Sequence, residues 1–228
     1  MGILTNFNTY LAMLRSDPVR FIIIMLLSIV AILATLIFHE VAHGWVAWKC
    51  GDPTAKMMGR LSLDPRKHLD PIGTACLVLF SFGWAKPVPV NPRNFRGDYR
   101  RDDFLVSVAG VTVNLTLFII SYIVCFFLGR ARYSDFLYYV YYFFSMFYRI
   151  NLGIAVFNLL PIPPLDGFHV LNDLILKGKL SMNPQFFQIA QFILIALCFT
   201  GALSGILSTI TGAIEGGMYN LLTAIAGA

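Results

Sequence analysis

The chain has 228 residues and a formal net charge of +5, with 57% hydrophobic and only 13% charged residues. This hydrophobic fraction is high, since apolar residues, glycine included, make up about 45–50% of a soluble protein. The mean hydropathy of +0.72 agrees with it. A core of this size cannot hide that apolar surplus, so the composition excludes an ordinary soluble domain. It predicts a multi-pass protein in contact with the lipid bilayer. The positive charge is assigned to loops that set membrane topology, and no nucleic-acid partner is expected.

The first membrane crossing is predicted from Val19 to about Trp48, a long apolar run. The 30 residues from Arg20 to Lys49 would extend about 45 Å as a helix, enough to cross hydrocarbon and headgroups. Residues 5–14 before it are expected to form a short interfacial helix.

A polar loop and a small β element are predicted after the first crossing. Residues 59–64 (GRLSLD) and 85–90 look like strands, and the prolines of the second favour an exposed edge. Residues 72–84 are apolar but too few to span, which favours a re-entrant segment. The charged stretch 93–103 follows.

Three more crossings complete an all-α membrane protein with about four transmembrane helices. They are predicted at about 104–128, 136–160 and 186–207, with an amphipathic piece at 166–176 and an apolar, glycine-rich tail at 212–228. We expect one domain over residues 1–228: an interfacial segment (1–18), a core (19–176), and a C-terminal helix and tail (177–228).

Lysine and arginine counts predict the orientation. Ten of these residues lie between Lys49 and Arg101, whereas the 129–135 loop has two. The positive-inside rule therefore puts residues 50–103 and 177–185 in the cytoplasm and both termini outside.

The sharpest chemical signal is the HExxH sequence of residues 39–43. His39 and His43 are four residues apart, so on a helix both imidazoles can reach one metal ion. Glu40 beside them can take a proton from zinc-bound water, and this pattern typifies zinc metalloproteases. Two structural histidines are the alternative, but polar groups within an apolar span are costly and functional by default.

Catalytic zinc usually has three protein ligands and an open position, so a third ligand is required. Depth selects among the candidates His68, Asp70, Asp166 and His169. Counted at helical rise from the nearest interfacial charge, four polar groups lie about 9–16 Å inside the membrane. These groups are His43, His39, Asn114 and Asp166. Asp166 is preferred because His68 lies nearer the charges of the loop.

With these motifs the chain resembles the site-2 protease family of intramembrane zinc metalloproteases, in its compact bacterial form without a PDZ or CBS domain. The matching stretches, in family order, are FHEVAHGW (38–45), GRLSLDPRKHLDPIGT (59–74), WAKPVPVNP (84–92), GVTVN (110–114) and FNLLPIPPLDG (157–167). The chain departs from the family after LDG, where Phe168 and His169 replace the usual glycine or arginine. This leaves open whether His169 competes as a ligand or tunes Asp166.

The resemblance implies a role for each matched residue. His39, His43 and Asp166 would bind one Zn²⁺ per chain, Glu40 would be general base and later general acid, and Asn114 and Asn158 would hold the substrate backbone or the developing oxyanion. The alternative for the two asparagines is a structural role in helix packing.

The expected activity is hydrolysis of a peptide bond in or near the transmembrane segment of a single-span membrane protein, as in regulated intramembrane proteolysis. The expected location is the cell membrane, as in a bacterial inner membrane, with the active site toward the cytoplasm. The alternative is a membrane protein that binds or transports a divalent cation with the same residues. Glu40 discriminates between them, because a pure binding site needs no general base.

Overall fold

A computed structural model of the chain describes residues 7–73, 85–131, 134–177 and 183–227. These residues form helices joined by loops. In chain order they are α1 (Phe7–Ser16), α2 (Pro18–Cys50), α3 (Thr54–Met57), the 3₁₀ turns Pro65–Lys67 and Pro92–Asn94, α5 (Tyr99–Leu128), α6 (Asp135–Asn158), α7 (Asp166–Leu174), α8 (Pro184–Thr200) and α9 (Ser204–Ala226).

The long helices begin and end at residues with the appropriate capping chemistry. Asp17 accepts a hydrogen bond from the Arg20 N–H at the start of α2, and Asp98 does the same for Arg101 in α5. Gly51 ends α2 with a φ of 112°, a left-handed conformation that glycine adopts without steric cost.

Three helices, α2, α5 and α6, are long and apolar enough to cross a membrane, which confirms the multi-pass prediction. The α8–α9 pair would make a fourth crossing if its two helices are counted as one span, but the pair bends by 76°. The predicted crossing at 186–207 therefore contains a break. Gly201 ends α8 in a left-handed conformation, and most of the predicted tail (212–228) is part of α9.

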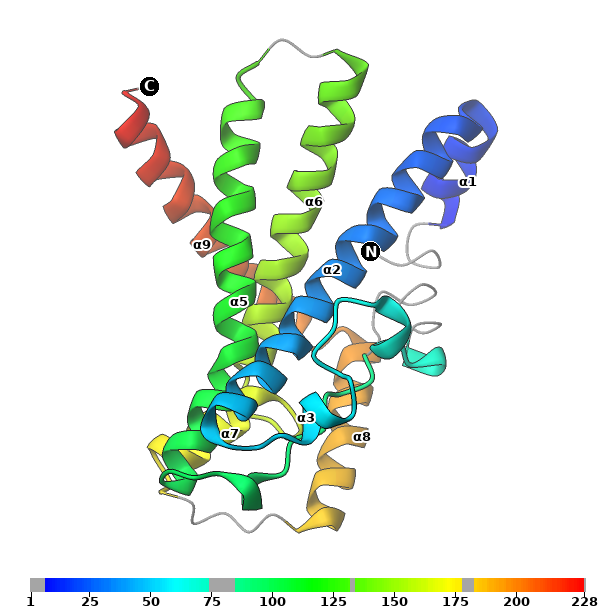
Figure 1. The fold of residues 1–228 in the computed structure, drawn as a ribbon. Helices are drawn as coiled ribbons and strands as arrows, with labels where there is room; N and C mark the ends of the chain where they lie inside the picture. Colours follow the sequence, from blue (N-terminus) through cyan, green and yellow to red (C-terminus); the bar gives the residue numbers. More distant parts are fainter. Residues whose placement is uncertain (1–6, 74–84, 132–133, 178–182, 228) are drawn as a thin grey trace.

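The three long helices pack side by side (Figure 1), with α5 in contact with both α2 and α6. Asn151 of α6 is fully buried and donates from Nδ2 to Thr35 Oγ1 of α2 at 3.0 Å. An apolar cluster of α5 and α6, including Phe118, Tyr148 and Leu152, continues the packing. The short helices α3 and α7 and the loop after α2 lie at one end of this bundle, and α1 and the C-terminus lie toward the other.

The predicted β element is wrong for the residues that the structure describes, since none of them forms a strand. Residues 59–64 form a turn, a bend and irregular backbone, and residues 85–90 have no regular secondary structure. No strand ladder joins the two segments; instead the side chain of Arg60 donates from Nη2 to the carbonyls of Lys86 and Pro87 at 2.7 and 3.1 Å. Most of the predicted re-entrant segment (72–84) lies outside the described residues.

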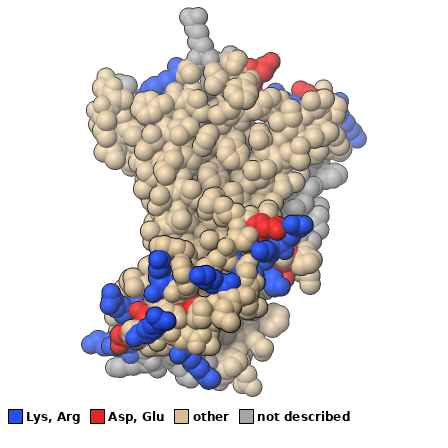
Figure 2. All heavy atoms as spheres, viewed as in Figure 1, with Lys and Arg blue, Asp and Glu red and all other residues tan. Residues whose placement is uncertain are grey.

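Charged side chains gather at the end of the molecule that carries these loops (Figure 2). On the face in view, a band almost without charges crosses the middle of the molecule, and a smaller charged group follows at the opposite end. This distribution fits contact between the middle of that face and the bilayer.

Candidate metal centre

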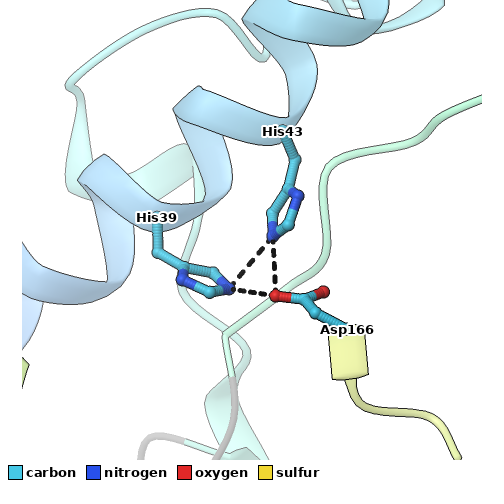
Figure 3. Close-up of side chains that lie close together, drawn as sticks. All are labelled: His39, His43 and Asp166. Atoms are coloured by element: carbon cyan, nitrogen blue, oxygen red, sulfur yellow. Dashed lines mark hydrogen bonds and ion pairs between the residues drawn. The ribbon is translucent and has the colours of Figure 1, made fainter. Parts of the chain in front are cut away.

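Two helices bring three potential metal ligands together (Figure 3). His39 and His43 lie one turn apart on α2, and Asp166 is the first residue of α7. The two Nε2 atoms are 3.0 Å apart, and each lies 3.3 Å from Asp166 Oδ2. Among the described residues, these three form the only group of histidine, cysteine or carboxylate side chains arranged to hold a metal.

The spacing of the three atoms fits zinc. A tetrahedral site with bonds of about 2.0–2.1 Å has neighbouring ligands about 3.3–3.4 Å apart, close to the observed triangle. Asp166 Oδ2 is buried, and the two Nε2 atoms, which cannot donate to it when they bind a metal, are its polar neighbours; a carboxylate left unsatisfied is costly to bury. A cation between the three atoms would satisfy it. Three protein ligands also leave the fourth position that catalytic zinc requires.

Helix α5 forms the wall behind the two histidines. The carbonyl of Val106 lies 2.7 Å from His43 Nδ1 and can accept a hydrogen bond from its N–H. With the proton on Nδ1, the neutral imidazole has Nε2 free to bind a metal. Asn114 Nδ2 lies 3.1 Å from His39 Nδ1. Gly110 sits between these two contacts, and a Cβ there would collide with His43 Nε2 and lie 2.5 Å from His39 Cε1.

The backbone that carries Asp166 is held against the end of α6. A Cβ on Gly167 would collide with the carbonyl of Leu159 and lie 2.6 Å from that of Leu160. Only glycine permits this approach, which places the first turn of α7 beside α2. Two residues of the LDG sequence are therefore explained: Asp166 supplies a ligand atom, and Gly167 leaves room for the carbonyl groups at the end of α6.

Glu40 is half-buried, and its Oε2 accepts a hydrogen bond from the Val88 N–H at 2.7 Å. Segment 85–90 reaches α2 here because Gly44 has no side chain. A Cβ at Gly44 would lie 2.7 Å from Leu61 Cδ2 and 2.8 Å from Val88 Cγ1. The carboxylate of the predicted general base is thus oriented by a loop.

The rejected ligand candidates have other partners. His68 is 2% exposed and its Nε2 contacts the carbonyl of Ser62, while Asp70 accepts from the Gly73 N–H. His169 Nδ1 lies 3.2 Å from Asp103 Oδ2 of α5.

A buried acidic group adjoins His169. Burial raises the pKa of the Asp173 carboxyl to about 6, and the charge of Asp103 adds to this shift. Burial lowers the pKa of His169, but the hydrogen bond to Asp103 and the charges of the nearby carboxylates together outweigh burial and raise the pKa. These three residues join α7 to α5 one or two turns from Asp166.

The two predicted asparagines lie in different surroundings. Asn114 is fully buried beside His39, whereas Asn158 is partly exposed and donates to the Ile154 carbonyl of its own helix. Sequence reasoning missed Val88, Val106 and Asp103. The first two act through backbone atoms, which leave no signal in residue type, whereas a carboxylate so near an apolar span was a signal for Asp103.

Comparison with known proteins gives a consistent result. Residues 134–201, which include Asn158 and Asp166, match the family described as Peptidase family M50. The chain is 42% identical over 153 residues to "Putative zinc metalloprotease YwhC" of Bacillus subtilis, an alignment that covers 66% of this chain and 69% of that protein.

More distant relatives share the same description. The chain is 30% identical over 169 residues to "Putative zinc metalloprotease Rip2" of Mycolicibacterium smegmatis and 32% identical over 161 residues to the Mycobacterium tuberculosis protein of that name. These alignments cover 71% and 68% of this chain, and 63% and 60% of the relatives. No solved structure matches the chain.

Proposed function

The chain belongs to peptidase family M50, the site-2 protease family of zinc metallopeptidases, and we propose that it hydrolyses a peptide bond in or near the transmembrane segment of a membrane-protein substrate. The observation that carries the proposal is the position of the zinc-ligand set. His39 and His43 lie eleven and seven residues before the end of α2, about 16 and 10 Å at helical rise. The reaction would therefore take place below the surface of the bilayer.

Each residue of the site has a role in this proposal. His39, His43 and Asp166 hold the metal. Bound zinc supplies Lewis-acid chemistry that lowers the pKa of a water toward neutrality and polarises a carbonyl. Glu40 accepts the proton of the attacking water and later delivers it to the leaving amine. Asn158 is partly exposed and can contact the substrate backbone or the developing oxyanion.

The substrate must unwind before cleavage, because a helix shields its own peptide bonds with hydrogen bonds. Segment 85–90 contacts Glu40 through the Val88 N–H, so we propose that the unwound chain lies next to this segment when it reaches the site. A single-span protein, which exposes one helix to lipid on all sides, is the substrate class that fits.

The charged end of the molecule suggests an orientation. The ten lysines and arginines between Lys49 and Arg101 would lie in the cytoplasm by the positive-inside rule, with the site on that side of a cell membrane. The proposed setting is regulated intramembrane proteolysis in a bacterial inner membrane.

Replacement of Glu40 by glutamine tests the function. The amide keeps the size of the side chain but cannot accept the proton, so cleavage of a single-span peptide in liposomes should fall about 10²–10⁴-fold. Zinc content should not change. Glu215 of α9 is the other glutamate of the chain, and Glu215→Gln is the matched control with wild-type cleavage.

Two results would contradict the proposal. The first is cleavage by Glu40→Gln at the wild-type rate, measured by the masses of the products. The second is zinc-dependent ion flux through the wild-type protein without any cleavage, which would favour the cation transporter.

A further inference from the structure

Asn114 of α5 is the buried polar side chain that lies next to the metal ligands. It is fully buried, and its Nδ2 atom lies 3.1 Å from His39 Nδ1. Its Oδ1 atom is also buried and has no hydrogen-bond partner. A buried amide beside a ligand, with one end unsatisfied, requires an explanation.

The chemistry of imidazole decides how this amide can act. His39 can bind zinc through Nε2 only if Nε2 has no proton, so Nδ1 carries it and needs an acceptor. An amide NH₂ group cannot accept a hydrogen bond from this N–H, whereas an amide oxygen can. The two ends of an amide have nearly the same shape, so a half-turn about Cβ–Cγ brings Oδ1 to Nδ1 without repacking.

His43 shows the same principle with a backbone acceptor. Its Nδ1 lies 2.7 Å from the Val106 carbonyl, eight residues before Asn114 on the same helix. One face of α5 thus presents an acceptor, then Gly110 without a side chain, then the amide, at intervals of one turn. Such outer partners fix the tautomer and the ring orientation of metal-binding histidines.

We propose that Asn114 is a positioning residue for zinc: its side-chain oxygen accepts a hydrogen bond from the Nδ1–H of His39 and holds the imidazole in the tautomer that binds the metal. This inference rests on the proposed zinc function and deepens it. It replaces the substrate contact expected from the family resemblance, because a side chain with no exposed surface cannot touch a substrate. Asn158, which is partly exposed, remains the candidate for that contact.

Three variants of the full-length protein in detergent test the proposal. Asn114→Leu removes the acceptor at similar size, Asn114→Asp retains it, and Asn158→Leu is the matched control on α6. Zinc affinity is measured by competition with a chromophoric chelator, and the coordination of substituted Co²⁺ by its visible absorption. Cleavage of a single-span peptide by the zinc-saturated variants gives kcat and KM.

Asn114→Leu should bind zinc about 10–100-fold more weakly and change the Co²⁺ spectrum, with KM unchanged at saturating zinc. Asn114→Asp and Asn158→Leu should bind zinc as tightly as the wild type. Wild-type zinc affinity in Asn114→Leu, together with a raised KM, would overturn the proposal in favour of a substrate contact.

The aspartate variant keeps the test decisive if the leucine variant does not fold. A tenfold loss of zinc affinity in Asn114→Asp would also overturn the proposal, because the acceptor is still present there. Either failure concerns metal affinity alone and leaves the Glu40→Gln test of the proteolytic function untouched.

Discussion

The corner where α2, α5 and α7 meet and the C-terminal pair of α8 and α9 are both built from apolar helices, yet they use burial differently. In the corner the buried residues include polar ones such as His39, Asn114 and Asp173. In the C-terminal pair the buried residues are Ala190, Leu194 and Leu222, all apolar.

The difference shows what fixes helices in place inside a membrane. Apolar contacts between helices compete with equally apolar lipid and specify position weakly, whereas a buried polar group needs one particular partner. The metal corner is therefore held by directional contacts at short distances. The C-terminal pair has no such contacts among its buried side chains.

The variants with the largest expected effect are those that remove a metal ligand. His43→Ala and Asp166→Ala each remove one of three ligands, so the zinc content of the purified protein should fall from about one per chain to nearly none. His68→Ala and His169→Ala should keep their zinc, because these side chains bond to Ser62 and Asp103. Elemental analysis measures all four. Zinc loss in His169→Ala with retention in Asp166→Ala would invalidate the ligand assignment.

Two glycines, one in the metal corner and one in the C-terminal pair, allow the same substitution to be compared in both regions. A Cβ on Gly110 would collide with His43 Nε2, so Gly110→Ala should displace the imidazoles and weaken zinc binding at least tenfold. A Cβ on Gly212 of α9 meets nothing within 4 Å. Gly212→Ala should leave zinc binding unchanged and add up to about 1 kcal/mol of helix stability.

Chelator competition and thermal unfolding in detergent measure the two glycine variants. Equal zinc affinity in both variants would mean that Gly110 of α5 does not lie in close contact with His39 and His43.

The sequence points to the metal corner through residue type. His39, His43 and Asp166 are polar residues in apolar surroundings, helical rise predicts them at one depth, and the structure brings their ligand atoms together. The three long helices could be predicted for the same reason, since their length and hydropathy match a bilayer.

Where the prediction failed, the deciding atoms carry no residue-type signal. Residues 59–64 alternate like a strand, but the buried Arg60 side chain donates to the carbonyls of Lys86 and Pro87, and irregular backbone replaces the strand. The bend between α8 and α9 depends on Gly201, one of several glycines in a uniformly apolar stretch. An apolar run of this kind predicts a helix without telling where it breaks.

An effect that appears only when the pH changes concerns Asp173, which helps to join α7 to α5. Its pKa is raised to about 6 by burial and by the charge of Asp103, from about 3.9 in an unfolded chain. A raised carboxyl pKa means that the fold favours the protonated form. The associated stability is complete below pH 4 and is lost as the pH rises through 6. The two-unit shift corresponds to at most about 2–3 kcal/mol.

Asp173→Asn imitates the protonated carboxyl and should remove this dependence. Its melting temperature in detergent should match the wild type near pH 4 and exceed it by a few degrees at pH 8. A decline at high pH should persist in both proteins, because the raised pKa of His169 makes its charge stabilising only at lower pH. If the melting temperature of Asp173→Asn runs parallel to that of the wild type across this range, the Asp173 carboxyl is ionised in the fold at ordinary pH, and the junction of α7 with α5 does not depend on its proton.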